Sequence, residues 1–232
     1  MPAQLQDPVA HLREWLHKPA PQGRWLIGVS GLPGAGKSTL AKRWAHETNA
    51  HRGTESVAAL SMDGFHLTKA TLARCPDPQA AFARRGAPWT FDPLALRAHL
   101  MALRAGESVS WPGFEHAVGD PVPGALQVGS EIRVALVEGL YLLHDQHGWD
   151  LAGCFDEHWF VDVDMNTAMA RLEDRHMAAN QQSRAQARAR LDGNDRLNAT
   201  IAAGARAKAR WLVSNPALIP PAAPVAPAAH AS

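Results

Sequence analysis

A glycine-rich stretch followed at once by a lysine and two hydroxyl side chains, GLPGAGKST at residues 31–39, carries the most distinctive chemistry of this sequence. It fits the pattern G-x-x-x-x-G-K-[ST], in which glycines let the backbone curl until its N–H groups converge on phosphate oxygens. Lys37 would reach the β- and γ-phosphates of a nucleotide, and the Ser38 hydroxyl would bind Mg²⁺. The stretch therefore predicts a phosphate-binding loop, or P-loop, for ATP or GTP. The residues expected to contact the nucleotide are Gly31, Gly34, Ala35, Gly36, Lys37, Ser38 and Thr39.

Acidic residues stand at the ends of three apolar runs that we expect to form strands: Asp63, Glu138, and Asp162 or Asp164. Ligands of open α/β sheets bind outside the carboxyl ends of the strands. Asp63 could accept the proton of an acceptor hydroxyl during phosphoryl transfer, and Glu138 could support Mg²⁺. An Asp-Gly turn and an ordinary strand-end glutamate are the competing interpretations. For Asp162 and Asp164 we favour structural roles.

Two arginines four residues apart, Arg171 and Arg175, share one face of an expected helix. Such a pair could hold phosphate charge in a transition state, or could belong to a solvated face beside acidic neighbours. The segment 184–210 is also basic, but it has neither interleaved aromatic residues nor the signature of a known module. We therefore expect no nucleic-acid partner.

The loop and the acidic residues must be positioned by a sheet. Apolar runs predict strands at 25–30, 57–62, 132–137, 159–164 and 211–213. Helices are predicted at about 8–16, 37–48, 92–104, 166–178 and 183–191. The glycine- and proline-rich segments 65–91 and 106–131 are expected to be irregular or to form short strands and loops. Continuous apolar strands separated by helices indicate an α/β domain of three layers, with a parallel sheet covered on both faces.

The composition, with 46% hydrophobic and 19% charged residues and a net charge of +1, is typical of a soluble globular protein. The N-terminus lacks the apolar run of a signal peptide, and no run of 18 apolar residues predicts a membrane span. Two distant cysteines form no disulfide framework, so we expect a cytoplasmic location. Because no membrane span is predicted, we also expect no membrane partner. We expect one domain over residues 1–215 and a disordered Ala/Pro tail over residues 216–232.

Five motifs in order give the sequence a family resemblance: the P-loop, SMDGFH (61–66), RRGAPWTFD (84–92), VEGLYLL (137–143) and RLEDRH (171–176). Together they resemble the uridine kinase, phosphoribulokinase and bacterial pantothenate kinase family of P-loop kinases, over about residues 22–213. The resemblance implies a three-layer P-loop NTPase fold with a mostly parallel sheet and a helical lid. It also implies ATP-dependent phosphorylation of a small-molecule hydroxyl with ATP and Mg²⁺. Asp63 would then be the catalytic base, Glu138 the magnesium-linked acid, and Arg171 and Arg175 part of the mobile lid.

The resemblance is closest to a poorly characterised bacterial branch of sugar or nucleoside kinases, some of which accompany fructose uptake systems. That branch shares the Asn-Asp-x-x-Asn-Ala motif, here residues 194–199. Uridine kinases have a ribose-holding Asp where this chain has Trp89, which argues against uridine as acceptor. The acceptor residues that we expect are Asp63, His66, Trp89, Phe114 and His116. For Asn194 and Asn198 we expect helix capping, ahead of a place in the adenine pocket.

A nucleotide-dependent regulatory ATPase without a small-molecule acceptor is the alternative function. The sequence has no Asn-Lys-x-Asp guanine motif, no transporter-type signature and no Asp-Glu pair at the end of a strand, and all three absences disfavour it. Acceptor-dependent consumption of ATP would separate the two functions. The sequence sets neither the acceptor nor the oligomeric state, and a homodimer is compatible with it.

Overall fold

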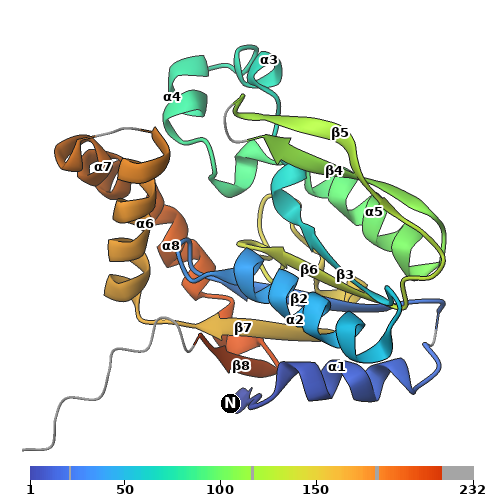
Figure 1. Cartoon of the computed structure of the whole chain (residues 1–232). Helices are drawn as coiled ribbons and strands as arrows, with labels where there is room; N and C mark the ends of the chain where they lie inside the picture. Colours follow the sequence, from blue (N-terminus) through green and yellow to red (C-terminus); the bar gives the residue numbers. More distant parts are fainter. Residues whose placement is uncertain (21, 116–117, 181–182, 216–232) are drawn as a thin grey trace, which may run out of the picture.

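The computed structural model describes residues 1–20, 22–115, 118–180 and 183–215, and a six-stranded parallel sheet lies at its centre (Figure 1). In spatial order the strands are β1 (Ala3–Gln4), β8 (Trp211–Ser214), β7 (Glu157–Asp162), β2 (Trp25–Gly31), β6 (Val134–Gly139) and β3 (Val57–Ser61). The strand that precedes the P-loop, β2, therefore lies inside the sheet between β7 and β6. The carboxyl end of β2 therefore lies near the middle of the edge at which the parallel strands end.

The register of the sheet brings the predicted acidic residues to that same edge. Val29 of β2 pairs with Glu138 of β6, and Glu138 in turn pairs with Ser61 of β3. Asp63 follows Ser61 by two residues, in a 3₁₀ turn over Met62–Phe65. Parallel strands end at a common edge, so the P-loop, Glu138 and Asp63 become neighbours although they are far apart in sequence.

Two apolar cores, one on each face, make the fold three-layered. The first core takes buried residues from α1 (Pro8–Leu16), α2 (Lys37–Arg52), α6 (Met165–Asn180) and α8 (Arg196–Ala203). The second takes them from α5 (Pro93–Arg104) and the antiparallel hairpin of β4 (Val109–Glu115) and β5 (Asp120–Val128). Within β2, Ile27 belongs to the first core and Leu26 to the second, as expected for a strand buried on both faces. The predicted three-layer α/β fold is confirmed.

Three helices begin in the same way, with an aspartate followed by a proline. Asp7, Asp77 and Asp92 each accept a hydrogen bond of 2.9 Å from the backbone N–H three residues further on. This side-chain cap satisfies a donor that has no partner within the helix, and proline fits the first helical position. Two of the starts were predicted. The third opens α4 (Pro78–Ala83), which with α3 (Lys69–Leu72) lies in a segment predicted to be irregular.

Helix boundaries near the C-terminal half differ from the predicted ones. The chain leaves α7 (Arg184–Arg190) through a π-helical turn, Leu191–Asp195, and enters α8 without a break, where no helix was predicted. No side chain caps the start of α8, so the expectation that Asn194 and Asn198 act as helix caps is wrong. Figure 1 shows α6, α7 and α8 on one side of the sheet edge and α3, α4 and the β4–β5 hairpin on the other.

Within the described part of the chain, no helix is both long and apolar enough to cross a membrane. The Ala/Pro segment 216–232, predicted to be disordered, lies outside the described residues, as does His116. Both expectations therefore stay predictions.

Candidate active site

The P-loop wraps around the start of α2. Gly34 and Gly36 have left-handed backbones with φ of +82° and +86°, a conformation that side chains with a Cβ rarely adopt. Lys37 is the first residue of α2, and its buried Nζ donates a hydrogen bond of 2.9 Å to the carbonyl oxygen of Leu32 inside the loop. α2 begins directly at the end of this curl, and the first N–H groups of a helix have no partner within the helix. The arrangement fits the phosphates of a nucleotide.

The glycines of the loop also allow α6 to approach closely. A Cβ on Gly34 would strike the backbone carbonyl oxygen of Ala168 in α6. A Cβ on Gly36 would lie 2.9 Å from Nη1 of Arg171 and 2.6 Å from Nδ2 of Asn215. Arg171 Nη1 is buried and has no hydrogen-bond partner among the described residues. A guanidinium with an unsatisfied donor therefore lies against the loop, and an anionic oxygen is the strongest partner for such a donor.

Gly34→Ala is expected to lower the free energy of unfolding by about 3 kcal/mol or more, because left-handed strain adds to the clash with the α6 backbone. Gly53→Ala is the matched control. Gly53 has φ of +70° but nothing within 4 Å of an added Cβ, so only the strain of about 1–2 kcal/mol applies. Denaturant unfolding of the two variants measures the difference. Equal losses would show that α6 does not pack on the loop as described.

Three charged groups meet behind the loop. The Ser38 hydroxyl donates a hydrogen bond of 2.9 Å to Glu138, which is 5% exposed. Burial, followed by the charge of Asp63, raises the pKa of Glu138, while Lys37 and the hydroxyls of Ser61 and Ser38 oppose this shift. Burial lowers the pKa of Lys37, against the opposing effects of Glu138 and Asp63. Lys37, Glu138 and Asp63 therefore form one electrostatic cluster.

The cluster offers oxygen donors that suit Mg²⁺. This ion commonly takes one or two protein oxygens and completes its coordination with water and substrate phosphates. The Ser38 hydroxyl and the Glu138 carboxylate supply such oxygens beside a curl of backbone N–H groups and the Lys37 ammonium. The residues present therefore fit a magnesium–nucleotide complex.

Aromatic rings form a wall next to Asp63. His66 Nδ1 donates a hydrogen bond of 2.8 Å to the carbonyl oxygen of Asp63. The imidazole ring centre lies 3.9 Å from that of Phe91 and 4.6 Å from that of Phe114. Gly64 meets the backbone of Pro112, so the hairpin packs directly on the turn that carries Asp63. These contacts set the position of Asp63 relative to the wall.

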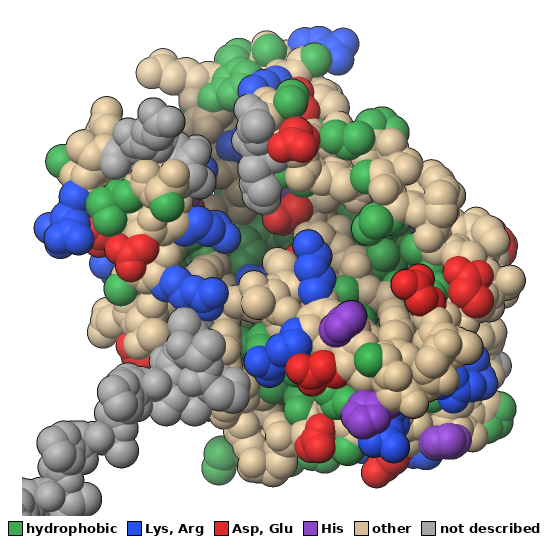
Figure 2. All heavy atoms as spheres, viewed as in Figure 1, with side chains coloured by type: hydrophobic (Ala, Val, Ile, Leu, Met, Phe, Trp, Pro, Cys, Tyr) green, Lys and Arg blue, Asp and Glu red, His purple; other side chains and the backbone are tan. Residues whose placement is uncertain are grey.

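A cavity of about 490 Å³ connects the P-loop with this wall. Pro33 of the loop, Asp63 and Arg175 of α6 line it, together with His66 and Phe114. Figure 2 shows the hollow between the α6–α7 region and the rest of the molecule, with Lys and Arg side chains at its rim. Its size is in the range of small-molecule sites. A small acceptor can therefore lie beside Asp63 and close to the expected γ-phosphate position.

The structure does not bring every predicted site residue to the cavity. Trp89 is 39% exposed and is not among the residues that line it. Arg175 lines it, and its charge acts on Lys37. Asp162 pairs with Arg206 at 2.8 Å, and Asp164 accepts hydrogen bonds from the first turn of α6, so both have structural partners. The functional roles of the predicted site residues stay predictions.

Several cavity residues were not singled out from the sequence. Lys69, Arg85 and Phe91 line the cavity from the segment before α5, and Asp195 lines it from the turn before α8. Asn198, which was expected to cap a helix or to lie in the adenine pocket, lines the cavity as well. Arg85, Phe91 and Asp195 belong to two shared motifs, RRGAPWTFD and Asn-Asp-x-x-Asn-Ala, whereas Lys69 lies in neither. These motifs name the segments involved, but not which side chains face the cavity.

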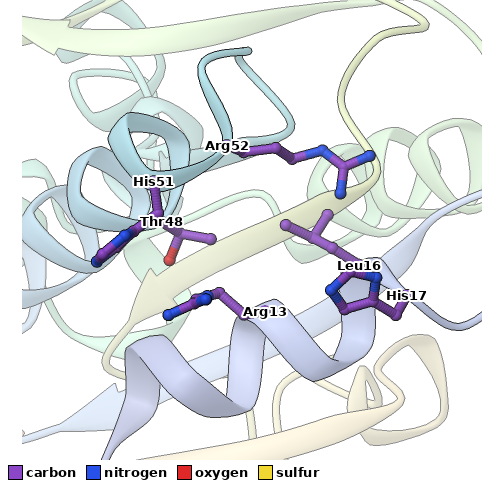
Figure 3. Close-up of a pocket in the computed structure, with 6 residues that line it drawn as sticks. All are labelled: Arg13, Leu16, His17, Thr48, His51 and Arg52. Atoms are coloured by element: carbon purple, nitrogen blue, oxygen red, sulfur yellow. The ribbon is translucent and has the colours of Figure 1, made fainter.

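A second, smaller pocket of about 210 Å³ lies between α1 and α2 (Figure 3). Its lining consists of Arg13, Leu16, His17, Thr48, His51 and Arg52. Arg13, His51 and Arg52 belong to the last turns of the two helices, where cationic side chains balance the partial negative charge of a helix C-terminus. This pocket is remote from the carboxyl ends of the strands, and its lining contains no carboxylate.

Comparison with known proteins agrees with this geometry. Residues 26–186 match the model of the "Phosphoribulokinase / Uridine kinase family". The chain is 37% identical over 184 residues to "Putative uridine kinase C227.14" of Schizosaccharomyces pombe, covering 78% of each protein. The crystal structure of a "putative fructose transport system kinase" from Silicibacter sp. TM1040 has a TM-score of 0.77 at 36% identity, over 88% of this chain and 98% of that one.

YFH7 from Saccharomyces cerevisiae, described as "a putative P-loop containing kinase with a circular permutation", shares the fold. Its TM-score is 0.75 at 20% identity, over 90% of this chain and 98% of that one. The family match covers more than half of the chain and includes the P-loop, Asp63, Glu138 and both lid arginines. The chain therefore belongs to the phosphoribulokinase/uridine kinase family of P-loop kinases.

Proposed function

We propose that this protein transfers the γ-phosphoryl group of Mg-ATP to a hydroxyl of a small metabolite such as a sugar, a nucleoside or a vitamin-like compound. The observation that supports the proposal best is the cavity of about 490 Å³, which places Asp63 and Arg175 beside the P-loop. A nucleotide switch needs no such space next to its phosphates. An acceptor kinase needs it, because the hydroxyl must lie in line with the transferred group.

Each residue then has one task. Lys37 and the loop N–H groups hold the β- and γ-phosphates, and Arg171 and Arg175 neutralise charge on the transferred group. Ser38 and Glu138 hold Mg²⁺, whose chemistry when bound is to screen the phosphate charge. Asp63 accepts the proton of the attacking hydroxyl. Phosphoryl transfer depends mainly on position and charge, so the fixed edge of the sheet supplies most of the catalysis.

The acceptor lies against His66 and Phe114 in this proposal. Both rings line the cavity and contact each other, so they offer it an apolar surface. Two of the relatives are named for uridine and for a fructose transport system. A sugar ring or a sugar-like polyol fits such a surface, with Asp63 directed at one hydroxyl.

Release of ADP from Mg-ATP across an acceptor panel tests the proposal. The panel holds pantothenate, uridine, fructose, glycerate and ribulose 5-phosphate, and Lys37→Ala provides the blank. We expect one class of acceptor to stimulate release and Lys37→Ala to abolish it. Release that needs Lys37 but responds to no acceptor, in this panel and in a wider metabolite set, would support the regulatory ATPase instead.

The pH dependence of the reaction should report on Glu138. Burial and the charge of Asp63 raise the pKa of Glu138 above its ordinary 4.5, so its metal-binding form is lost at a higher pH than for an exposed carboxylate. The activity is therefore expected to fall on the acid side, as pH decreases through this raised pKa. Mg²⁺ competes with the proton, so about tenfold more Mg²⁺ should move the acid limb down by up to about one pH unit. A limb of kcat/KM that does not respond to Mg²⁺ would contradict the role of Glu138.

A further inference from the structure

Arg85 is held rigidly in the cavity wall. Its side chain is 17% exposed, and Nη2 donates hydrogen bonds to the carbonyl oxygen of Leu67 at 3.0 Å and to Asp120 at 3.1 Å. The backbone N–H of Lys69 fixes the same Asp120 oxygen at 2.8 Å. The guanidinium carbon lies 5.7 Å from the ring centre of Phe114, which also lines the cavity. The side chain therefore has one well-defined position.

These contacts use only part of the hydrogen-bonding capacity of Arg85. A guanidinium has five N–H donors, and the two hydrogen bonds both leave from Nη2. Nε is buried without a hydrogen-bond partner, and Nη1 makes no hydrogen bond to any described residue. Leaving a buried donor unsatisfied costs free energy, and an anionic oxygen is its strongest partner. Arg85 therefore has N–H donors beside the cavity that make no hydrogen bond to the described residues.

The backbone around Arg85 is held from three other parts of the chain. Three side chains donate hydrogen bonds to its carbonyl groups: Asn194 to Arg85 at 2.8 Å, Tyr141 to Gly86 at 2.6 Å and Trp149 to Pro88 at 3.0 Å. Asn198 in turn donates to Asn194. These hydrogen bonds suggest a role for the Asn-Asp-x-x-Asn-Ala motif: it holds the Arg85 segment against the turn between α7 and α8. Such a support is typical of a side chain that must bind a ligand in one orientation.

The charge of the cavity also favours an anion. Four Lys and Arg side chains and two Asp side chains line it. One of the two acids, Asp195, accepts a hydrogen bond of 2.8 Å from His176 of α6. Lys69 lies on the same wall as Arg85, and its Nζ donates to the carbonyl oxygen of Val118. A ligand part that contacts this wall is therefore attracted if it is negative.

From these observations we propose that the acceptor carries an anionic group, a phosphate or a carboxylate, in addition to its reacting hydroxyl, and that Arg85 binds this group. The inference rests on the proposed kinase function and narrows the class of its acceptor. Arg85 holds the anionic end of the acceptor at the wall, so that the hydroxyl at the other end faces Asp63. Neutral sugars and nucleosides offer Arg85 no charged partner, so they make weaker hydrogen bonds with it and are poorer acceptors.

A binding experiment tests the anion site without knowledge of the acceptor. The protein is saturated with a non-hydrolysable Mg-ATP analogue, so that the P-loop is filled, and thermal unfolding is followed with added inorganic phosphate or acetate. Either probe at about ten times its dissociation constant should raise Tm by about 3–6 °C. Arg85→Gln should lose most of this increase. Arg74→Gln, an exposed arginine of the same segment that does not line the cavity, should retain it. An increase in Arg85→Gln equal to that of the wild type overturns the proposal.

Kinetics with matched acceptors separates anion recognition from a structural role. Each pair differs in one charged group: fructose 6-phosphate and fructose, glycerate and glycerol, pantothenate and pantothenyl alcohol. The charged member of the preferred pair should have a kcat/KM about 10- to 100-fold higher, as expected for charge-assisted hydrogen bonds. Arg85→Gln should remove this preference, and Arg85→Lys should restore part of it.

Two outcomes of the kinetic experiment count against the inference. One is a neutral acceptor that reacts as well as its charged partner. The other is an Arg85→Gln variant that lowers kcat/KM equally for both members, which indicates a structural arginine. If no member of any pair is phosphorylated, and no compound of the wider metabolite set is either, the kinase function fails, and the phosphate-binding experiment alone decides whether Arg85 forms an anion site.

Discussion

Asp63→Asn is expected to lower kcat at least about a hundredfold and to leave the affinity for a Mg-ATP analogue nearly unchanged. Asparagine keeps the shape of the side chain and the contacts of the turn, but it cannot accept a proton from the acceptor. Turnover with the preferred acceptor and calorimetric titration of the analogue measure the two quantities. Asp162→Asn is the matched control, because Asp162 ends another strand of the same sheet, β7, and pairs with Arg206 away from the cavity lining.

The same variant has a second readout. The charge of Asp63 raises the pKa of Glu138, so its removal should lower that pKa and move the acid limb of the residual activity to lower pH. A purely structural effect of the substitution would not move the limb in this direction. Unchanged turnover in Asp63→Asn would remove Asp63 from the role of base.

Lys37→Met should lower kcat about a thousandfold or more and weaken binding of the nucleotide. Methionine fills the space of the lysine stem but supplies neither charge nor donor at the β- and γ-phosphates. Lys42→Met, an exposed lysine one turn further along α2, is the control and should keep full activity. Circular dichroism of both variants checks the fold, because the buried Lys37 ammonium also donates to the carbonyl oxygen of Leu32.

The two arms of this experiment are informative separately. Loss of turnover with retained nucleotide affinity would place the effect of Lys37 in the transition state alone. Loss of both indicates that Lys37 holds the ground-state phosphates as well. Normal turnover in Lys37→Met would contradict the assignment of GLPGAGKST as a working P-loop.

Much of the fold could be predicted because its strands are buried on both faces. A run such as Val134–Val137 is apolar throughout, which is typical of a strand in a parallel sheet covered on both faces. The Asp-Pro starts at residues 7 and 92 predicted helix origins that the structure has at those positions. The same signal at Asp77-Pro78 stands among prolines and a glycine, which favour an irregular segment and conceal the helix start. Only two residues form β1, too few for any periodic pattern.

The grouping of candidate site residues at one edge of the sheet was predictable for a similar reason. Lys37 and Asp63 follow strands and Glu138 lies near the end of one. Parallel strands bring their ends together, so linear motifs were sufficient to place these residues in one neighbourhood. The part of the cavity wall that is proposed to contact the acceptor was not predictable in this way. Arg84 donates a hydrogen bond to Asn198, and Asn194 donates one to the Arg85 carbonyl oxygen. These contacts form only when the segment before α5 packs on the turn between α7 and α8, which no local pattern encodes. For the same reason, nothing in the sequence indicated that Trp89 lies outside the cavity lining.

The most direct test of the central claim follows the γ-phosphoryl group itself. ATP labelled at the γ-phosphorus is incubated with the protein and the acceptor that best stimulates ADP release, and phosphorus NMR identifies the labelled product. The account predicts a phosphate ester that forms in equal amount to ADP and is absent with Lys37→Met. Labelled inorganic phosphate as the only product, at a rate that no acceptor changes, would contradict the kinase assignment.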